Sequence, residues 1–344
     1  MPVIALDAMG GDHAPDVTAL GALRAAFMGI DVVLVGDEVE VMAALDRAFV
    51  EAGQRREELG IARSRLRVVH APDRIRMEEH AAREMRSRRK SSIYVGTELV
   101  KHGEADAFVS AGNTGAVLVT ALVVLGRLAG VERPALAAVL PAMSGLRLLV
   151  DVGANAESRA THLVQFAFLG DAYARAALEV KQPRVALLSI GEEASKGSPT
   201  IVEAHSTLAE SRLHFVGNVE GRDLTATNIA DVIVADGTVG NVALKTIEGV
   251  ASMLRDEMGA IARSSWRGRV GGWLLMPGLS ATRERMDYRN YGGAPLLGVN
   301  GLVYIAHGRS DARAVENALL SAAEDVRAGL LATLAGSVGG VSTS

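Results

Sequence analysis

Short runs of apolar residues, separated by stretches with helical periodicity, recur along the whole chain. Most of these runs are apolar at every position, which is typical of strands that are covered on both faces of a parallel sheet. The segments between them are long enough for the crossover helices that parallel strands need. We therefore predict an α/β protein with a largely parallel sheet and strands at 3–6, 32–35, 66–69, 107–109, 135–140, 146–150, 185–188, 213–216 and 232–234.

The pattern changes near the end of the chain. Val299 and the run at 302–305 look like a late strand pair around a tight turn at Asn300-Gly301. A last amphipathic helix follows, capped by Ser310 or Asp311; its apolar stripe consists of Val315, Leu319, Ala322, Val326 and Leu330. We see neither a repeat nor a long linker, so we expect one two-lobed domain over 1–333. The Gly/Ser-rich tail 334–344 is expected to be disordered.

The segment 249–287 differs from the rest of the chain. It begins with an apolar stripe at helical spacing, and it then holds both tryptophans of the chain among several arginines. This pattern predicts a protruding helical hairpin with an apolar, basic tip. Trp and Leu beside Arg suit a membrane surface or an acidic carrier protein, and a dimer interface is the alternative. The candidate docking residues are Trp266, Arg267, Arg269, Trp273, Leu274 and Leu275.

Composition narrows the class of protein. The 344 residues are 49% hydrophobic, which is enough for a large core, and the net charge of −4 gives no general attraction to nucleic acid. The absence of cysteine excludes thiolate nucleophiles, thiolate metal ligands and disulfides. No signal peptide is apparent, and the longest apolar run, 116–125, is too short to cross a bilayer and is expected to be a buried helix. We therefore expect a cytoplasmic protein, with mean hydropathy of +0.21 reflecting its core.

Loops rich in glycine and asparagine follow six of the predicted strands. Glycine lets backbone N–H groups approach a ligand, and a helix that starts after such a loop favours an anion. In open α/β sheets ligands bind beyond the carboxyl ends of the strands. One such loop alone is most simply a turn, but six together favour an anion site, most of all for phosphate. The loops lie at 7–13, 110–115, 151–155, 189–197, 217–221 and 236–241.

Other phosphate and catalytic motifs are absent from the sequence. The glycines at 10–11 do not form a dinucleotide fingerprint, and we find no Walker A motif, nucleophile elbow or zinc-binding histidine spacing. We therefore expect no cofactor and no metal.

The loops, taken in order, resemble the bacterial phosphate acyltransferase family, the acyl-(acyl-carrier-protein):phosphate acyltransferases of phospholipid synthesis. The resemblance extends over about 2–332. Four differences lie at Glu157, Ser198, Thr238 and Arg309, where the family usually has Asp, Asn, an aromatic residue and Ser. The stretches that carry it are IALDAMGGDHAPD at 4–16, VSAGNTGA at 109–116, ERPALA at 132–137, DVGAN at 151–155, IGEEASKG at 190–197, FVGNVEGRD at 215–223, DGTVGNVALKTIEG at 236–249, DYRNYGGAPLLGVNG at 287–301 and AHGRSD at 306–311.

The resemblance implies a reaction, a fold and partners. Acyl carrier protein thioester and inorganic phosphate would give acyl phosphate and free carrier. The sheet would be three-layered α/β/α, related to phosphotransacetylases and isopropylmalate dehydrogenases, and the protein would be a homodimer. A membrane surface or a membrane-bound glycerol-3-phosphate acyltransferase would be a further partner.

Phosphate is the nucleophile in that reaction, so the protein has to bind and orient it and stabilise the oxyanion. We expect Lys196 to bind phosphate, and Asn113 and Asn155 to contact the thioester oxygen. His13 either protonates the leaving thiolate or caps the first helix, and Lys245 either binds phosphate or is a surface lysine. Asp7, Asp151 and Asp236 are expected to hold loops. The other candidate substrate-binding residues are Gly10, Gly11, Asp12, Gly191, Asn218, Gly240 and Asn241.

Two other functions remain as alternatives. A metal- and nicotinamide-dependent decarboxylating dehydrogenase of the related fold would need clustered aspartates, and Asp231 and Asp236 are too isolated for that role. A non-catalytic scaffold of lipid synthesis would recruit partners without chemistry.

Overall fold

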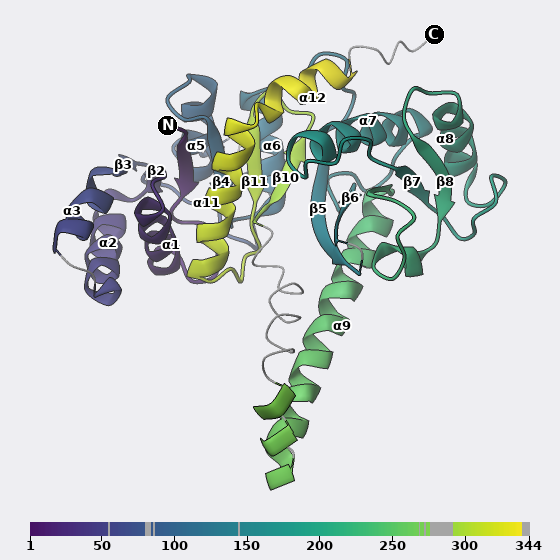
Figure 1. Ribbon diagram of the computed structural model, residues 1–344. Coiled ribbons are helices and arrows are strands. Elements are labelled where there is room, and N and C mark those ends of the chain that lie inside the picture. The colour runs from purple at the N-terminus through teal and green to yellow at the C-terminus, as the bar shows by residue number, and fades with distance from the viewer. Residues whose placement is uncertain are drawn as a thin grey trace.

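A single sheet runs through both lobes of the protein in the computed structural model (Figure 1). The structure describes residues 1–53, 56–79, 84, 87–143, 145–267, 269–271, 273–275 and 292–338. The sheet has eleven strands in the order β3-β2-β1-β4-β11-β10-β5-β6-β9-β7-β8. Their bounds are β1 Val3–Asp7, β2 Asp31–Gly36, β3 Leu66–His70, β4 Ala107–Ser110, β5 Ala135–Ala142, β6 Gly145–Val150, β7 Val185–Leu188, β8 Phe215–Val219, β9 Val232–Val234, β10 Ala294–Leu297 and β11 Leu302–Ile305.

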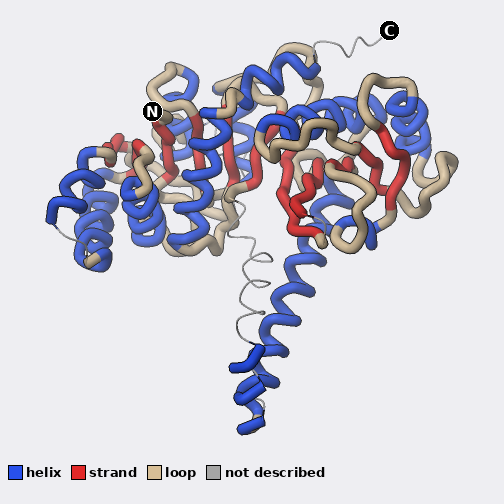
Figure 2. Tube along the Cα trace, viewed as in Figure 1, coloured by secondary structure: helices blue, strands red, loops and turns tan. Residues whose placement is uncertain are grey.

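Helices cover both faces of this sheet, as Figure 2 shows in blue against the red strands. The first nine strands match the nine apolar runs of the sequence, so the prediction of a largely parallel α/β sheet is confirmed. The described helices are α1 Asp16–Phe27, α2 Glu38–Ala52, α3 Arg56–Ser64, α5 Ser92–Lys101, α6 Thr114–Val124, α7 Ala160–Ala176, α8 Pro199–Ala209, α9 Gly237–Ser264, α11 Ala312–Arg327 and α12 Leu330–Val338, with a 3-10 turn, η1, at Gly221–Leu224.

Alternate residues of each strand enter different halves of the core. In β1, Ile4 and Leu6 join the cluster formed with α1, α7 and α11, whereas Ala5 joins the cluster formed with α5 and α6. Successive side chains of a strand point to opposite faces, so a strand that is apolar throughout needs a helical layer on each side. This requirement is why continuous apolar runs predicted the three-layer architecture.

The two lobes use the sheet in opposite directions. Strands β3, β2, β1, β4 and β11 are parallel to one another, and so are β6, β9, β7 and β8. Between the two groups, β10 pairs antiparallel with β11 and β5, and β5 pairs antiparallel with β6. The loops that follow β6, β9, β7 and β8 in the second lobe therefore leave the sheet at the opposite end from the loops that follow the parallel strands of the first lobe.

Helix α9 extends from the second lobe and projects far beyond the sheet (Figure 1). It has 28 residues, or about 42 Å at 1.5 Å per residue. The first half of the predicted hairpin is thus part of a longer helix that already begins at Gly237. Residues 266–267, 269–271 and 273–275 after it are also helical, whereas 268, 272 and 276–287 lie outside the described residues.

Two predictions near the carboxyl terminus are wrong. The partner strand of β11 is β10, with Ala294 opposite Ile305, whereas Val299 makes an isolated bridge with Arg127. The tail is not disordered at 334–338, because α12 continues to Val338 and buries it against the α7 face of the core. The last amphipathic helix is α11, capped by Asp311 as expected, and Leu330 starts α12 instead of continuing α11.

Candidate active site

One buried carboxylate, that of Asp7, organises the loop after β1. Asp7 is 1% exposed and accepts hydrogen bonds from the Ser110 hydroxyl at 2.7 Å and from the Met9 N–H at 3.1 Å. Burial raises the pKa of the Asp7 carboxyl, and these donors act against the rise. Gly10 is required here because a Cβ would lie 2.4 Å from the Asp7 carboxylate. Asp7 thus holds the loop that carries the predicted ligand-binding residues Gly10, Gly11 and Asp12.

The corresponding carboxylate of the second lobe is Asp151, which is fully buried. Its Oδ1 accepts from the N–H groups of Leu136, Gly153 and Ala154, at 3.0, 3.0 and 2.9 Å. Its Oδ2 accepts from the backbone N–H and the side-chain amide of Asn155, at 2.8 and 2.9 Å. Burial raises the pKa of Asp151, and the five donors favour the carboxylate. The expected loop-holding role of Asp7 and Asp151 is confirmed by these bonds.

Helix α9 begins directly against the Asp151 loop. Asp236 caps it by accepting from the Thr238 N–H at 3.0 Å. A Cβ on Gly240 would lie 1.9 Å from the Asp151 carbonyl oxygen, so only glycine allows the helix to approach this closely. One residue later, exposed Asn241 lies beside Gly153. The structure thus brings three of the predicted substrate-binding residues, Asn155, Gly240 and Asn241, to one place.

Lys196 stands on an exposed loop whose backbone is held from several sides. The Glu193 carbonyl accepts from the Lys196 N–H at 2.9 Å and from the Asn218 side chain at 3.0 Å. Ser189 donates to the Lys196 carbonyl at 3.0 Å. Within the described part of the chain, the Lys196 ammonium makes no ion pair. The loop therefore presents a full positive charge to solvent next to Gly191.

Asn218 is 5% exposed, and its amide is committed within the protein. Its Nδ2 donates to Glu193, so its Oδ1, 3.1 Å from the His205 Nδ1, has to accept from that ring nitrogen. His205 also packs edge-on against Phe215. Asn218 therefore holds the Lys196 loop through the Glu193 carbonyl. His205 belongs to the same hydrogen-bond network, and the sequence did not indicate it.

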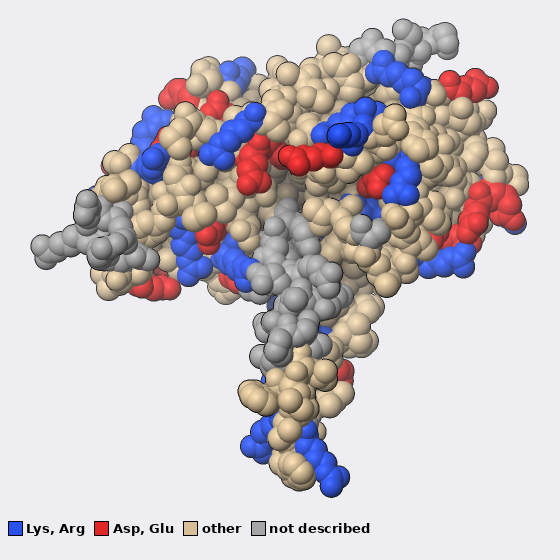
Figure 3. Space-filling model, in the orientation of Figure 1, with Lys and Arg blue, Asp and Glu red and all other residues tan. Residues whose placement is uncertain are grey.

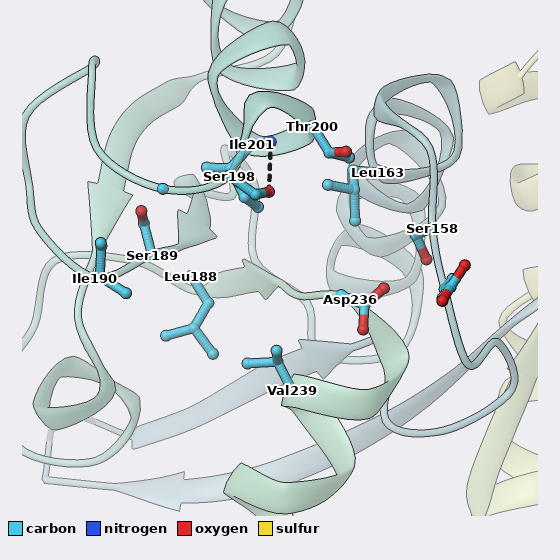
Figure 4. Close-up of a pocket in the computed structure, with 12 residues that line it drawn as sticks. Ser158, Leu163, Leu188, Ser189, Ile190, Ser198, Thr200, Ile201, Asp236 and Val239 are labelled. Carbon is cyan, nitrogen blue, oxygen red and sulfur yellow. Dashed lines mark hydrogen bonds between the residues drawn. The ribbon is translucent and has the colours of Figure 1, made fainter.

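A cavity of about 490 Å³ opens beside this loop (Figure 4). Its floor and walls include Leu163, Leu188, Ile201 and Val239, and its polar groups come from loops at the starts of α7, α8 and α9. The remaining lining residues are Glu157, Ser158, Ser189, Ile190, Gly197, Ser198, Thr200 and Asp236. Its volume lies within the range typical of small-molecule sites.

One loop of the first lobe lies close to Lys245 in the third turn of α9. Asp12 donates its N–H to the Gly308 carbonyl at 2.8 Å, next to His307. Burial lowers the pKa of His307, and the nearby positive charge of Lys245 lowers it further. Lys245 itself forms an ion pair with Glu248 at 2.7 Å. His307 lies within the 306–311 stretch of the sequence but was not among the predicted site residues.

The two asparagines that were expected to contact the thioester oxygen both form hydrogen bonds within the protein. Asn113 caps α6 and donates to the carbonyls of Arg76, Met77 and Glu79, at 3.3, 3.0 and 3.2 Å. Asn155 donates to the Pro134 carbonyl at 2.8 Å as well as to Asp151. Both side chains would have to give up these bonds to donate to a thioester oxygen.

Of the two roles left open for His13, the cap of the first helix is wrong. Pro15 occupies the cap position of α1, which has no side-chain cap bond. His13 instead is exposed and lines a small depression together with Gly10, Gly11 and Ser310. Its role as a general acid stays a prediction.

The predicted docking residues lie at the far end of the α9 projection. Trp266, Trp273, Leu274 and Leu275 are 63–74% exposed, and the Arg267 guanidinium lies 5.4 Å from the Trp266 ring centre. Figure 3 shows basic side chains gathered at the end of the projection. Among the described helices, none combines the length and apolarity needed to span a bilayer.

The fold and its loops define the class of protein. A phosphotransacetylase from Streptococcus pyogenes superposes with a TM-score of 0.61 over 95% of this chain and 94% of its own, at 18% identity. A 4-hydroxythreonine-4-phosphate dehydrogenase from Klebsiella pneumoniae superposes with a TM-score of 0.53 over 95% of this chain and all of its own, at 12% identity. The chain thus has the three-layer α/β fold of the phosphotransacetylases and of these dehydrogenases.

The sequence identifies the family. The protein family described as "Fatty acid synthesis protein" matches residues 3–332, and the chain belongs to this family. It is 49% identical over 330 residues to a phosphate acyltransferase of Thermus thermophilus, covering 96% of both chains. It is 46% identical over 332 residues to one of Heliobacterium modesticaldum, again over 96% of both. The chain is accordingly an enzyme of the acyltransferase class.

Proposed function

We propose that the enzyme transfers the acyl group of an acyl-(acyl carrier protein) thioester to inorganic phosphate, as an early step of bacterial phospholipid synthesis. The observation that carries the proposal is the exposed Lys196, which makes no ion pair with the described residues. It stands on a loop fixed among Gly- and Asn-rich turns, in a chain whose relatives are named phosphate acyltransferases. A lysine on a Gly-rich loop suits a phosphate ion.

The proposed reaction has a simple balance. A phosphate oxygen forms a bond to the thioester carbon, the carbon–sulfur bond breaks, and the thiolate takes up a proton. The protein supplies position and charge, since phosphate itself is the nucleophile. Lys196 is the proposed phosphate ligand, and exposed His13 is a candidate for protonating the thiolate.

Release of carrier thiol tests this function. Acyl carriers of several chain lengths are incubated with the enzyme, with and without phosphate, and free thiol and acyl phosphate are measured together. The proposal expects both products in equal amounts, and only when phosphate is present. Thiol release that is independent of phosphate would contradict the proposal. No release at all would also contradict it, and would favour the non-catalytic scaffold. Nicotinamide cofactors are expected to cause no absorbance change, which distinguishes the dehydrogenase alternative.

We further propose that a second copy of the chain covers part of the α9 projection. Along one stripe of the helix, Val250, Leu254, Met258 and Ile261 are 46–64% exposed in the single chain. A stripe of this kind at helical spacing suits a partner helix. Sedimentation velocity should show a dimer, and Leu254→Glu should shift it towards monomer. A monomeric wild-type protein would contradict this proposal.

The tip beyond this stripe is proposed to touch a membrane surface, from the cytoplasmic side. Exposed Trp and Leu side chains beside Arg267 and Arg269 match the composition of interfacial helices. Trp273→Ser and Leu275→Ser should reduce flotation with anionic vesicles and leave the dimer intact. Unchanged flotation with an intact dimer would count against membrane docking and leave carrier binding as the alternative.

A further inference from the structure

His162 is a buried titratable residue that the proposed reaction does not use. It is 5% exposed and lies in the first turn of α7, three residues after Arg159 at the cap position. Ser158 precedes the cap and Leu163 follows the histidine, and both of them line the cavity (Figure 4). A change at the start of α7 would therefore reach the candidate site directly.

Both nitrogens of the His162 ring face donors of Arg159. The Arg159 backbone N–H lies 3.2 Å from Nδ1, and the Arg159 guanidinium lies 3.0 Å from Nε2. A neutral imidazole has one N–H and one acceptor nitrogen, so it can accept from Arg159 on one of these sides. A doubly protonated ring has no acceptor and would turn an N–H towards a donor at both nitrogens. The contacts with Arg159 thus require a neutral His162.

A carboxylate from another part of the chain joins these two residues. Glu132 lies in the loop before β5, and its Oε2 is 2.5 Å from the Arg159 Nη2 and 3.3 Å from the His162 Nε2. The Glu132 backbone N–H donates to the Gln165 side chain at 2.8 Å, further along α7. The same side chain donates to the Gly130 carbonyl at 3.0 Å. The loop before β5 is therefore fixed to the start of α7 through its backbone and through its carboxylate.

These contacts reach the loop that carries Asn155. The Asn155 side chain donates to the Pro134 carbonyl at 2.8 Å, two residues after Glu132, and to the Asp151 carboxylate at 2.9 Å. Asp151 therefore holds one end of the 151–159 loop, and the contacts of Glu132 with the start of α7 hold the other end. Both ends have to be in place for Asn155 to keep its position.

We propose that His162 is a positioning residue, which holds the 151–159 loop in its active arrangement while the ring is neutral and releases it when the ring takes up a second proton. The inference rests on the proposed function, because acyl transfer is its main readout. His162 acts through the Arg159 backbone and the Glu132 carboxylate. Its titration should therefore appear in catalysis as a loss of activity at acid pH.

The surroundings of the ring favour the neutral form. Burial lowers the pKa of His162, the positive charges of Arg159 and Arg133 lower it further, and the carboxylate of Glu132 acts in the opposite direction. The Phe166 ring, 6.4 Å away on the same helix, carries no charge. The folded protein therefore binds this proton less tightly than the unfolded chain does, and the stabilisation by the neutral ring is lost as the pH falls through the lowered pKa.

His162→Gln separates the hydrogen bonds of the ring from its titration. A glutamine at the third position of a helix can accept from the N–H of the cap residue and donate to Glu132, but it cannot take up a proton. At pH 7.5 this variant should keep kcat/KM within about twofold of the wild type, whereas His162→Ala should lose about fivefold, the effect of one ordinary hydrogen bond. His102→Gln is the matched control, since His102 is exposed at the end of α5.

The pH profile tests the release of the loop. The ratio of kcat/KM for His162→Gln to that for the wild type should rise as the pH falls from 7.5 to 5, because only the wild type can protonate residue 162. Other groups that titrate in this range, phosphate among them, are common to both enzymes and cancel in the ratio. The ratio for His102→Gln should stay constant. A constant ratio for His162→Gln, or equal defects of the glutamine and alanine variants at pH 7.5, would overturn the proposal.

A measurement without substrate separates this inference from the proposed function. The NMR signal of the Asn155 side-chain amide should move as the pH falls in the wild type and in His102→Gln, but not in His162→Gln. If the wild type forms no acyl phosphate and the signal moves in this pattern, the proposed function fails and the hold by His162 stands. If acyl phosphate is formed and the Asn155 signal moves equally in all three proteins, the role of His162 fails alone.

Discussion

Asp151→Asn should destabilise the enzyme by an amount that follows from five hydrogen bonds. The Asn oxygen can take the place of Oδ1 and keep the three N–H donors that point to it. The new NH₂ group would then face the two Asn155 donors, which lose their acceptor. Leaving two buried donors unpaired costs about 1–3 kcal/mol each, or about 2–6 kcal/mol together.

The lost charge offsets part of this cost. Burial raises the pKa of Asp151, so a neutral side chain recovers some of the desolvation free energy. We therefore expect a loss of about 3 kcal/mol, a large part of the 5–15 kcal/mol by which proteins are usually stable. Since Asn155 and the start of α9 rest on this loop, catalysis should fall as well.

Urea unfolding followed by circular dichroism measures the effect. Asp236→Asn is the matched control. Asp236 follows a strand of the same lobe, but it accepts a hydrogen bond from a single N–H, that of Thr238. Asn caps helices as well as Asp does, so the substitution keeps this bond. The control should change the free energy of unfolding by less than about 0.5 kcal/mol. Equal stability of Asp151→Asn and the wild type would refute the view that the five bonds hold the loop.

Three further predictions concern single side chains. Lys196→Ala should lower turnover at low phosphate about a hundredfold, as loss of one well-placed donor does, and normal turnover would remove Lys196 from the site. His205→Ala should raise the KM for phosphate about fivefold by freeing Asn218, and His205→Asn, which keeps a donor at the Nδ1 position, should restore it; equal defects would contradict this positioning role. Burial raises the pKa of Asp325 from 3.8 to about 6, although the hydrogen bond from the Tyr304 hydroxyl acts against the rise. The folded protein therefore binds the carboxyl proton of Asp325 more tightly than the unfolded chain does, and it loses stability as the pH rises from about 4 to about 6. Asp325→Asn should therefore raise the free energy of unfolding by about 3 kcal/mol at pH 8 and by less at pH 5 in urea titrations, and a less stable variant at pH 8 would contradict the sign.

The layers of the fold could be predicted because most of the strands are apolar on both faces. Continuous runs such as those at β1 and β7 require two helical layers, whatever the details of packing. The position of β10 could not be predicted, because Pro295 makes that run look unlike a strand. In the structure Pro295 lies opposite Tyr304 of β11 and has no partner in β5, which pairs only with Leu296 and Leu297.

The candidate site was predictable at the level of loops but not of side-chain roles. Glycines at 237 and 240 point to close backbone approach in the sequence, and the structure shows the Asp151 loop as their neighbour. Whether an asparagine faces a ligand or a carbonyl depends on residues distant in sequence, as the bonds of Asn113 to 76–79 show. His205 gave no signal because its role depends on tertiary contacts alone.

A single-turnover experiment without phosphate shows whether phosphate attacks the thioester itself or whether the protein is acylated first. Enzyme is mixed with an equal amount of acyl carrier, and free thiol and the mass of the protein are followed before and after phosphate is added. We expect no thiol and no acylated protein until phosphate arrives, and then thiol and acyl phosphate in equal amounts. A burst of thiol that matches the enzyme concentration, together with an acylated protein, would contradict it.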